Sequence, residues 1–189
     1  MAGSATRVPG GTGISKPRRP RAAAAQRFTS PREPAAPAIG RGESIAAYAR
    51  RLIDAEPMQR IELEREGVAA SLIKALAQAM DLPATEVYAM LGVPRSTAEK
   101  KHAAGSRISG AHGQAAIAMM RLLGIAQRIV ANSTADAASG FDTARWLGQW
   151  IREPQPSLGG RRPADLLDTP TGAEAVMRVL GALESGAYQ

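Results

Sequence analysis

Histidine, cysteine and glycine are the residues that most directly test this chain for catalysis or metal binding. The only histidines are His102 and His112, and cysteine is absent. Neither histidine has a partner four residues away, so neither fits a helical pair of metal ligands or a proton relay. The glycines at 10–13 have no strand before them and no helix after them, and no phosphate-binding loop is present. The sequence therefore predicts a protein that is not an enzyme and that holds no metal and no cofactor.

A cluster of basic and hydroxyl side chains between residues 95 and 107 has the chemistry of a DNA contact. Lysine and arginine reach phosphates or guanine edges, and serine and threonine anchor phosphates. The cluster consists of Arg95, Ser96, Thr97, Lys100, Lys101 and Arg107. The alternative is a solvated face on three packed helices, and two features favour it: Glu99 lies within the cluster, and no Asn or Gln is placed to read adenine. We expect operator DNA as the partner, with this alternative open.

A helix-turn-helix would position this cluster. Residues 69–104 fit three short helices, with a tight glycine-containing turn at 92–94 between the second and the third. In such a unit the second helix of the pair lies in the major groove, and here that helix is Ser96–Ala103. Ser96 and Glu99 have the spacing of a capping box at the start of this helix, and Gly105 is expected to end the helix.

Composition and periodicity predict an all-α fold. Hydrophobic residues make up 44% of the chain but aromatic residues only 4%, so the core must consist mainly of Ala, Leu, Ile, Val and Met, which favours helix over sheet. No strand is expected. Apolar spacings of three and four residues predict helices both inside and outside the helix-turn-helix. They cover 45–53, 68–80, 84–91, 109–132 and 141–153, with a short helix from 163 and a last one from 170.

Capping and proline residues predict where the first helix, near residue 44, begins and ends. Ser44 is predicted to cap the first helix, and Pro57 is predicted to close this element. Residues 58–66 fit either a short extended piece or a helical turn, and we favour an extended connector, because Ile61 and Leu63 alternate with charged residues.

Similar signals mark the end of the chain. Pro163 is predicted to open a short helix at its first position, where a missing N–H costs nothing. The pair Thr169-Pro170 repeats this arrangement for the last helix, and Ser185-Gly186 is expected to stop it.

The long helix 109–132 has an apolar stripe broad enough for more than one neighbour, and it offers a surface for self-association. Because operator-binding proteins of this type need two-fold symmetry, we expect a homodimer.

The charge of +7 is confined to the N-terminal tail. Residues 1–41 contain eight basic residues and one acid, with few large apolar side chains, which predicts disorder. The tail is either an arm that touches DNA phosphates, or a solubilising tail or misassigned start.

The predicted domains are the tail at 1–41, a helical domain at 42–132 and a C-terminal domain at 133–189. No apolar run is long enough to span a membrane and no secretory signal is visible, so a cytoplasmic protein is expected.

Two tryptophans lie four residues apart near the start of the C-terminal domain. Trp146 and Trp150 therefore share one face of the helix 141–153. Tryptophan is enriched in binding hot spots, but a small domain also needs bulky residues in its core. We interpret Trp146 as a core residue, and for Trp150 both interpretations stay open.

The C-terminal domain resembles the toxin-binding domain of the Xre/MbcA/ParS antitoxin family. The resemblance lies in an ordered series of short motifs over about fifty residues, and the helix-turn-helix stands where this family has its Xre-like domain. The motifs are Trp146-Leu147, Pro154-x-Pro156-x-Leu158-Gly159-Gly160, Pro163-Ala-Asp165-Leu166-Leu167-Asp168-Thr169, Gly172, Val176, Leu180, Leu183-Glu184 and Gly186-Ala-Tyr188. The spacer 148–152 before Pro154 is longer than expected, which leaves the role of Trp150 in doubt.

The resemblance implies a function. Antitoxins of this family pair with RES-domain toxins, which degrade NAD or transfer its ADP-ribose to a protein, and the C-terminal domain covers the toxin's NAD-binding cleft. The complex often represses its own operon. The chain is therefore expected to be a type II antitoxin that neutralises a RES-domain toxin. A free-standing helix-turn-helix regulator is the alternative.

The residues expected to contact the toxin lie in the turn 158–162 and at two aromatic positions. Arg161 and Arg162 can pair with acidic groups by bidentate hydrogen bonds, although a solvated loop is equally compatible with them. Tyr188 near the C-terminus has a flat, amphipathic ring that suits a plug. The full predicted set is Trp150, Leu158, Gly159, Gly160, Arg161, Arg162 and Tyr188.

Overall fold

The computed structural model describes residues 1–4, 39–40, 42–133 and 140–183. The described helices and strands all lie within residues 34–189, a compact unit that we call the body. The predicted disorder of the tail falls mainly on residues outside the described ranges, as do Tyr188 and the stop signal Ser185-Gly186.

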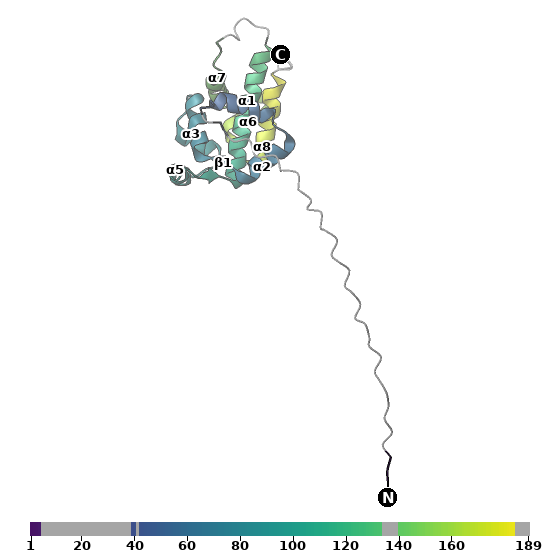
Figure 1. The fold of residues 1–189 in the computed structure, drawn as a ribbon. Coiled ribbons are helices and arrows are strands. Elements are labelled where there is room, and N and C mark those ends of the chain that lie inside the picture. The colour runs from purple at the N-terminus through teal and green to yellow at the C-terminus, as the bar shows by residue number, and fades with distance from the viewer. Residues whose placement is uncertain (5–38, 41, 134–139, 184–189) are drawn as a thin grey trace. The chain divides into compact units, whose positions relative to one another are not determined.

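The body is helical, as predicted (Figure 1). The described ranges contain α1 (Ile45–Ile53), α2 (Pro57–Glu66), α3 (Ala70–Ala79), α4 (Ala84–Met90), α5 (Arg95–Ala103), α6 (Gly110–Asn132), α7 (Thr143–Trp150) and α8 (Pro170–Ala182). Short 3-10 helices η2 (Pro156–Leu158) and η3 (Pro163–Asp165) lie between α7 and α8. The prediction of no strand is wrong in a small way, because β1 (Val68–Ala69) pairs antiparallel with β2 (Arg107–Ile108).

The long helix α6 is the centre of the body. Helices α1, α7 and α8 pack against it, and most of its apolar side chains are buried there. By length and composition α6 could also cross a membrane, but a buried core helix passes the same test. A Cβ at Gly124 would meet the carbonyl oxygen of Ala49, so the lack of a side chain allows α1 to cross α6 closely.

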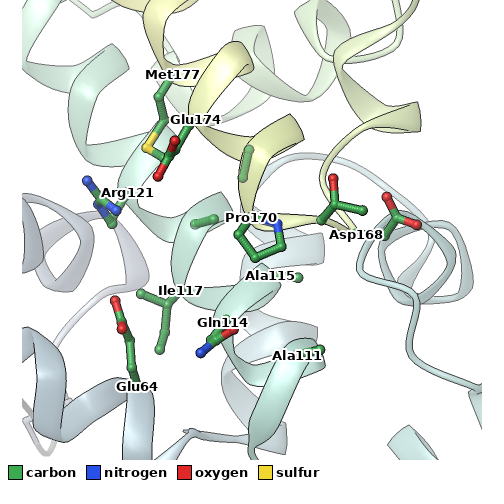
Figure 2. Close-up of a pocket in the computed structure, with 13 residues that line it drawn as sticks. Glu64, Ala111, Gln114, Ala115, Ile117, Arg121, Asp168, Pro170, Glu174 and Met177 are labelled. Carbon is green, nitrogen blue, oxygen red and sulfur yellow. The ribbon is translucent and has the colours of Figure 1, made fainter.

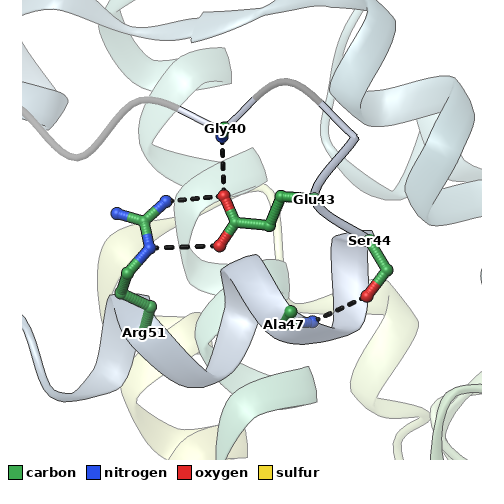
Figure 3. Close-up of polar contacts among 5 residues, drawn as sticks. All are labelled: Gly40, Glu43, Ser44, Ala47 and Arg51. Carbon is green, nitrogen blue, oxygen red and sulfur yellow. Dashed lines mark hydrogen bonds and ion pairs between the residues drawn. The ribbon is translucent and has the colours of Figure 1, made fainter.

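The first helix begins as the sequence predicts, but the second does not. Ser44 does cap α1, with its hydroxyl accepting a hydrogen bond from the Ala47 N–H at 3.1 Å (Figure 3). The predicted extended connector 58–66 is wrong, because these residues form α2. Pro57 opens this helix, and Glu56 and Gln59 form a capping box around its start.

The period of two that suggested an extended connector reflects burial on one side of α2. Leu63 is 1% exposed, whereas Ile61 is 37% exposed. A helix with a single buried residue lacks the repeated apolar spacing by which helices are recognised in a sequence.

The three helices of the helix-turn-helix end in the same way. After α3, α4 and α5 the chain enters the left-handed region at Asp81, Gly92 and Gly105, with φ of 55°, 65° and 61°. The next N–H then bonds back to a carbonyl in the last turn, for example from Val93 to Tyr88 at 2.8 Å. These repeated caps fix the short connections that orient α5.

Candidate functional site

Helix α5 is held in place by a polar contact to the helices beside it. Glu99 Oε2 accepts a hydrogen bond from Lys74 Nζ of α3 at 2.8 Å, and Glu99 Oε1 accepts one from the Tyr88 hydroxyl of α4 at 3.4 Å. The bond from Lys74 lowers the pKa of Glu99 and raises that of Lys74. The predicted capping box is therefore wrong. Pro94 occupies the cap position with no side-chain cap, and Glu99 bridges to the neighbouring helices instead of reaching back to Ser96.

The first turns of α5 present an open face. Arg95, Ser96 and Lys100 are exposed and Thr97 is half-buried. Within the described part of the chain, none of these four side chains has a hydrogen-bond or ion-pair partner. Ala98 on the opposite side is buried in the core. The structure thus brings four of the six predicted DNA-contact residues together on one helix with their donors unengaged.

The other two predicted DNA-contact residues hold the body together. Arg107 donates from Nε to the carbonyl oxygens of Glu66 at 3.2 Å and Gly67 at 3.1 Å, and its Nη2 pairs with Glu66 Oε2 at 3.2 Å. Lys101 Nζ donates to the Arg107 carbonyl oxygen at 2.8 Å. Both cations are thus used to fasten β2 to the end of α2 and to α5, which the basic character of the segment did not reveal.

Three aromatic residues near α7 form a cluster in which Trp146 stacks on Trp150 and Phe141 is tilted against Trp146. The ring centroids of Trp146 and Trp150 are 6.1 Å apart, and those of Phe141 and Trp146 are 6.2 Å apart. Trp150 is only 7% exposed and belongs to the core, while Trp146 is half-buried against that core. The open question on Trp150 therefore resolves toward packing, and we no longer count it among the toxin contacts. Phe141 is 43% exposed and was not among the residues predicted to contact the toxin, because a lone aromatic residue has no periodicity.

The turn 158–162 is largely exposed and is closed by backbone hydrogen bonds. Gly159 and Gly160 have φ of 67° and 75°, which favours glycine at both positions. Gln155 closes the turn, since its N–H donates to the Arg161 carbonyl at 3.0 Å and its own carbonyl accepts from the Gly160 N–H at 3.1 Å. Leu158 is half-buried against the core and anchors the turn to it. Gly159, Gly160 and Arg161 face solvent.

The two arginines of this turn differ in their engagement. Arg162 makes a two-pronged contact with Asp165, from Nε at 2.9 Å and from Nη2 at 2.7 Å. This contact lowers the pKa of Asp165 and raises that of Arg162. The side chain of Arg161 forms no such contact in the described ranges. Of the two predicted cations, Arg161 is the one available to a partner.

The segment after the turn begins as predicted. Pro163 opens η3, and the Ala164 N–H donates to the Ile151 carbonyl at 2.8 Å, which ties the turn to the end of α7. Thr169 caps α8, because its hydroxyl accepts from the Gly172 N–H at 3.2 Å with Pro170 at the first helical position. No group of three His, Asp or Glu side chains in the described residues is arranged to hold a metal ion.

Comparison with known proteins assigns both halves of the body. Residues 59–121 match the antitoxin Xre-like helix-turn-helix domain, and residues 137–186 match the antitoxin Xre/MbcA/ParS C-terminal toxin-binding domain. A "Prs ADP-ribosylating antitoxin" of Sphingobium sp. (strain YBL2) is 34% identical over 151 residues, which cover 80% of this chain and 93% of that protein. These matches favour an antitoxin over a free-standing regulator. The chain belongs to the Xre/MbcA/ParS family and is the antitoxin of a toxin–antitoxin system, with a helix-turn-helix domain and a toxin-binding domain.

Proposed function

We propose that this antitoxin neutralises a RES-domain toxin that consumes NAD, and that its C-terminal domain does so by covering the toxin's NAD-binding cleft. The observation that carries the proposal is the toxin-binding domain at 137–186, whose predicted contact turn is exposed and preformed. The name of the Sphingobium relative associates that antitoxin with ADP-ribosylation. Because ADP-ribosylation takes its ADP-ribose from NAD, a toxin of the same kind here would need an NAD cleft that an inhibitor can block.

The proposed contact surface is the turn formed by Leu158, Gly159, Gly160 and Arg161. Its backbone is fixed by Gln155 and its base by Leu158, so little conformational entropy is lost on binding. Arg161 supplies a guanidinium for an acidic group at the cleft, and the Arg162–Asp165 pair supports the turn from behind. Tyr188, outside the described residues, is proposed as a second contact at the cleft mouth.

We further propose that α5 binds operator DNA and that the antitoxin represses its own operon as a homodimer. The residues assigned to DNA are Arg95, Ser96, Thr97 and Lys100, because their donors are unengaged in the described structure. Lys101 and Arg107 act through the body, since their side chains already bond to backbone carbonyls. Because a homodimer presents two copies of α5 related by a two-fold axis, its operator should consist of two symmetric half-sites.

The test is co-purification with the RES-type protein encoded beside this chain, followed by an assay of NAD consumption. Removing all of 133–189 would strip α7 and α8 from α6 and expose the core, so surface variants are better probes. We expect the wild-type chain to abolish NAD consumption, and Arg161→Glu together with loss of residues 184–189 to restore most of it. Arg50→Glu, on the exposed side of α1, is the matched control. Full inhibition by the altered chain would refute the proposed contact surface, and absence of any complex would refute the RES-toxin assignment.

A further inference from the structure

One face of α6 carries cavities and charges that neither the toxin contact nor the DNA contact uses. Its exposed and half-buried residues recur at spacings of seven, four and three, so they lie on one stripe of the helix. The stripe consists of Gln114, Arg121, Ile125 and Arg128. Helix α2 lies along one side of this stripe and α8 along part of the other. We call the stripe and the residues of α2 and α8 that border it the α6 face.

The half of the α6 face toward the N-terminus of α6 is acidic. A cavity of about 290 Å³ lies there, with Ala111, Ala115 and Ala118 of α6 among its lining residues. Glu64 of α2 and Glu174 of α8 stand on opposite walls of this cavity (Figure 2). In the described ranges neither carboxylate has a hydrogen-bond or ion-pair partner.

The half toward the C-terminus of α6 is basic. A second cavity, of about 170 Å³, is lined by Arg60 of α2, by Arg121 and Arg128 of α6 and by two isoleucines, Ile53 and Ile125. None of the three guanidinium groups has a partner among the described residues. Arg121 lines both cavities, so the acidic and basic halves adjoin at this residue.

Apolar side chains are exposed beside these charges. Met58 and Ile61 of α2 are 46% and 37% exposed, and Ile125 is only half-buried. Apolar patches bordered by polar residues mark interaction sites on soluble proteins. The charges of both signs follow a fixed order along the α6 face, so they can pair with a partner whose charges run in the opposite order.

A second copy of this chain has the required order. A two-fold axis near Arg121 would set the basic half of one copy against the acidic half of the other, twice, as a self-complementary interface requires. Figure 1 shows α5 at the edge of the body away from α2 and α8, so this contact leaves the DNA-binding face open. We propose that the α6 face is the interface between two copies of this chain. The inference rests on the homodimer of the proposed function and assigns its surface.

The test uses two charge-reversed variants of the full chain. Glu64→Arg/Glu174→Arg makes both halves basic, and Arg60→Glu/Arg128→Glu makes both halves acidic. Each variant alone should dimerise at least about tenfold more weakly than wild type, because like charges then meet. A mixture of the two should form a heterodimer, because every pairing is again between opposite charges. Sedimentation velocity measures both effects, and circular dichroism verifies that each variant keeps its helices.

The outcomes separate this interface from the dimer itself. Arg50→Glu reverses an exposed charge on α1, outside the α6 face, and should leave dimerisation unchanged. A monomeric wild type would overturn both the homodimer and the interface. A dimeric wild type with two equally dimeric variants would keep the homodimer and overturn the interface. Weakened variants that fail to combine with each other, or a loss of toxin binding with dimerisation intact, would also overturn it.

Discussion

Glu99 on α5 and Lys74 on α3 form an ion pair of 2.8 Å that ties the proposed DNA-binding helix to the body. The two residues are 25 positions apart in the sequence, and the Tyr88 hydroxyl also bonds to Glu99. The carboxylate thus connects all three helices of the helix-turn-helix. Its contribution is to orientation, since partly exposed ion pairs add little to stability.

The first prediction concerns the pH dependence of this contact. The pKa of Glu99 lies below its usual value of 4.5, first because Lys74 donates a hydrogen bond to it. A carboxylate with a lowered folded-state pKa stabilises the fold above its unfolded pKa, and this stability is lost as the pH falls through the folded value. The difference in Tm between wild type and Glu99→Gln should therefore be constant near neutral pH and shrink below about pH 4.5. Thermal unfolding at a series of pH values measures this difference, and a Tm difference that did not change with pH would contradict the assignment.

The second prediction separates two adjacent lysines of α5. Lys100 is exposed and unengaged in the described structure, so Lys100→Ala should weaken operator binding about three- to tenfold and reduce the salt slope by about 1. Lys101 donates to the Arg107 carbonyl, so Lys101→Ala should cost about 0.5–1.5 kcal/mol of stability with a smaller effect on binding. Salt titrations of operator binding and denaturant unfolding distinguish the two. Equal salt slopes for both variants would contradict the assignment of Lys100 to DNA and of Lys101 to the fold.

The third prediction separates the two arginines of the toxin-contact turn. Arg161→Ala removes a cation with no partner in the described ranges, and it should weaken toxin inhibition about tenfold without loss of stability. Arg162→Ala removes the partner of Asp165 and should act indirectly, through a looser turn. Arg162→Lys keeps the charge but not the two-pronged geometry, so it should resemble Arg162→Ala. Inhibition that depended on Arg162 alone would show that the Asp165 pair opens on binding.

The fourth prediction compares two helical glycines. A Cβ on Gly148 would collide with the Met80 carbonyl oxygen, so Gly148→Ala should destabilise the body by about 1–3 kcal/mol. A Cβ on Gly181 of α8 meets no atom within 4 Å, so Gly181→Ala should stabilise it by about 0.5–1 kcal/mol. Chemical denaturation measures both changes. A neutral Gly148→Ala would mean that α7 packs less tightly on the end of α3 than the structure indicates.

Local chemistry in the sequence determined most of the helices and several of their ends. The caps at Ser44, Thr169 and Pro163 act within a few residues, so the sequence was sufficient to place them. Apolar spacing likewise predicted α6, because a helix buried on several sides repeats its signal over many turns. Helix α2 was mistaken for an extended segment because one buried residue, Leu63, gives no such repeat.

Tertiary structure alone decided which charged and aromatic side chains are available. Lys101 and Lys100 are neighbours of the same chemical type, yet only Lys101 meets a carbonyl, which is supplied by Arg107 of β2. Trp146 and Trp150 share a helix face, and only their distance from the core distinguishes them. Residue type states what a side chain is able to bind, but its partner comes from segments distant in sequence. The sequence by itself therefore determined the family and the helices, and packing determined which donors remain for DNA and toxin.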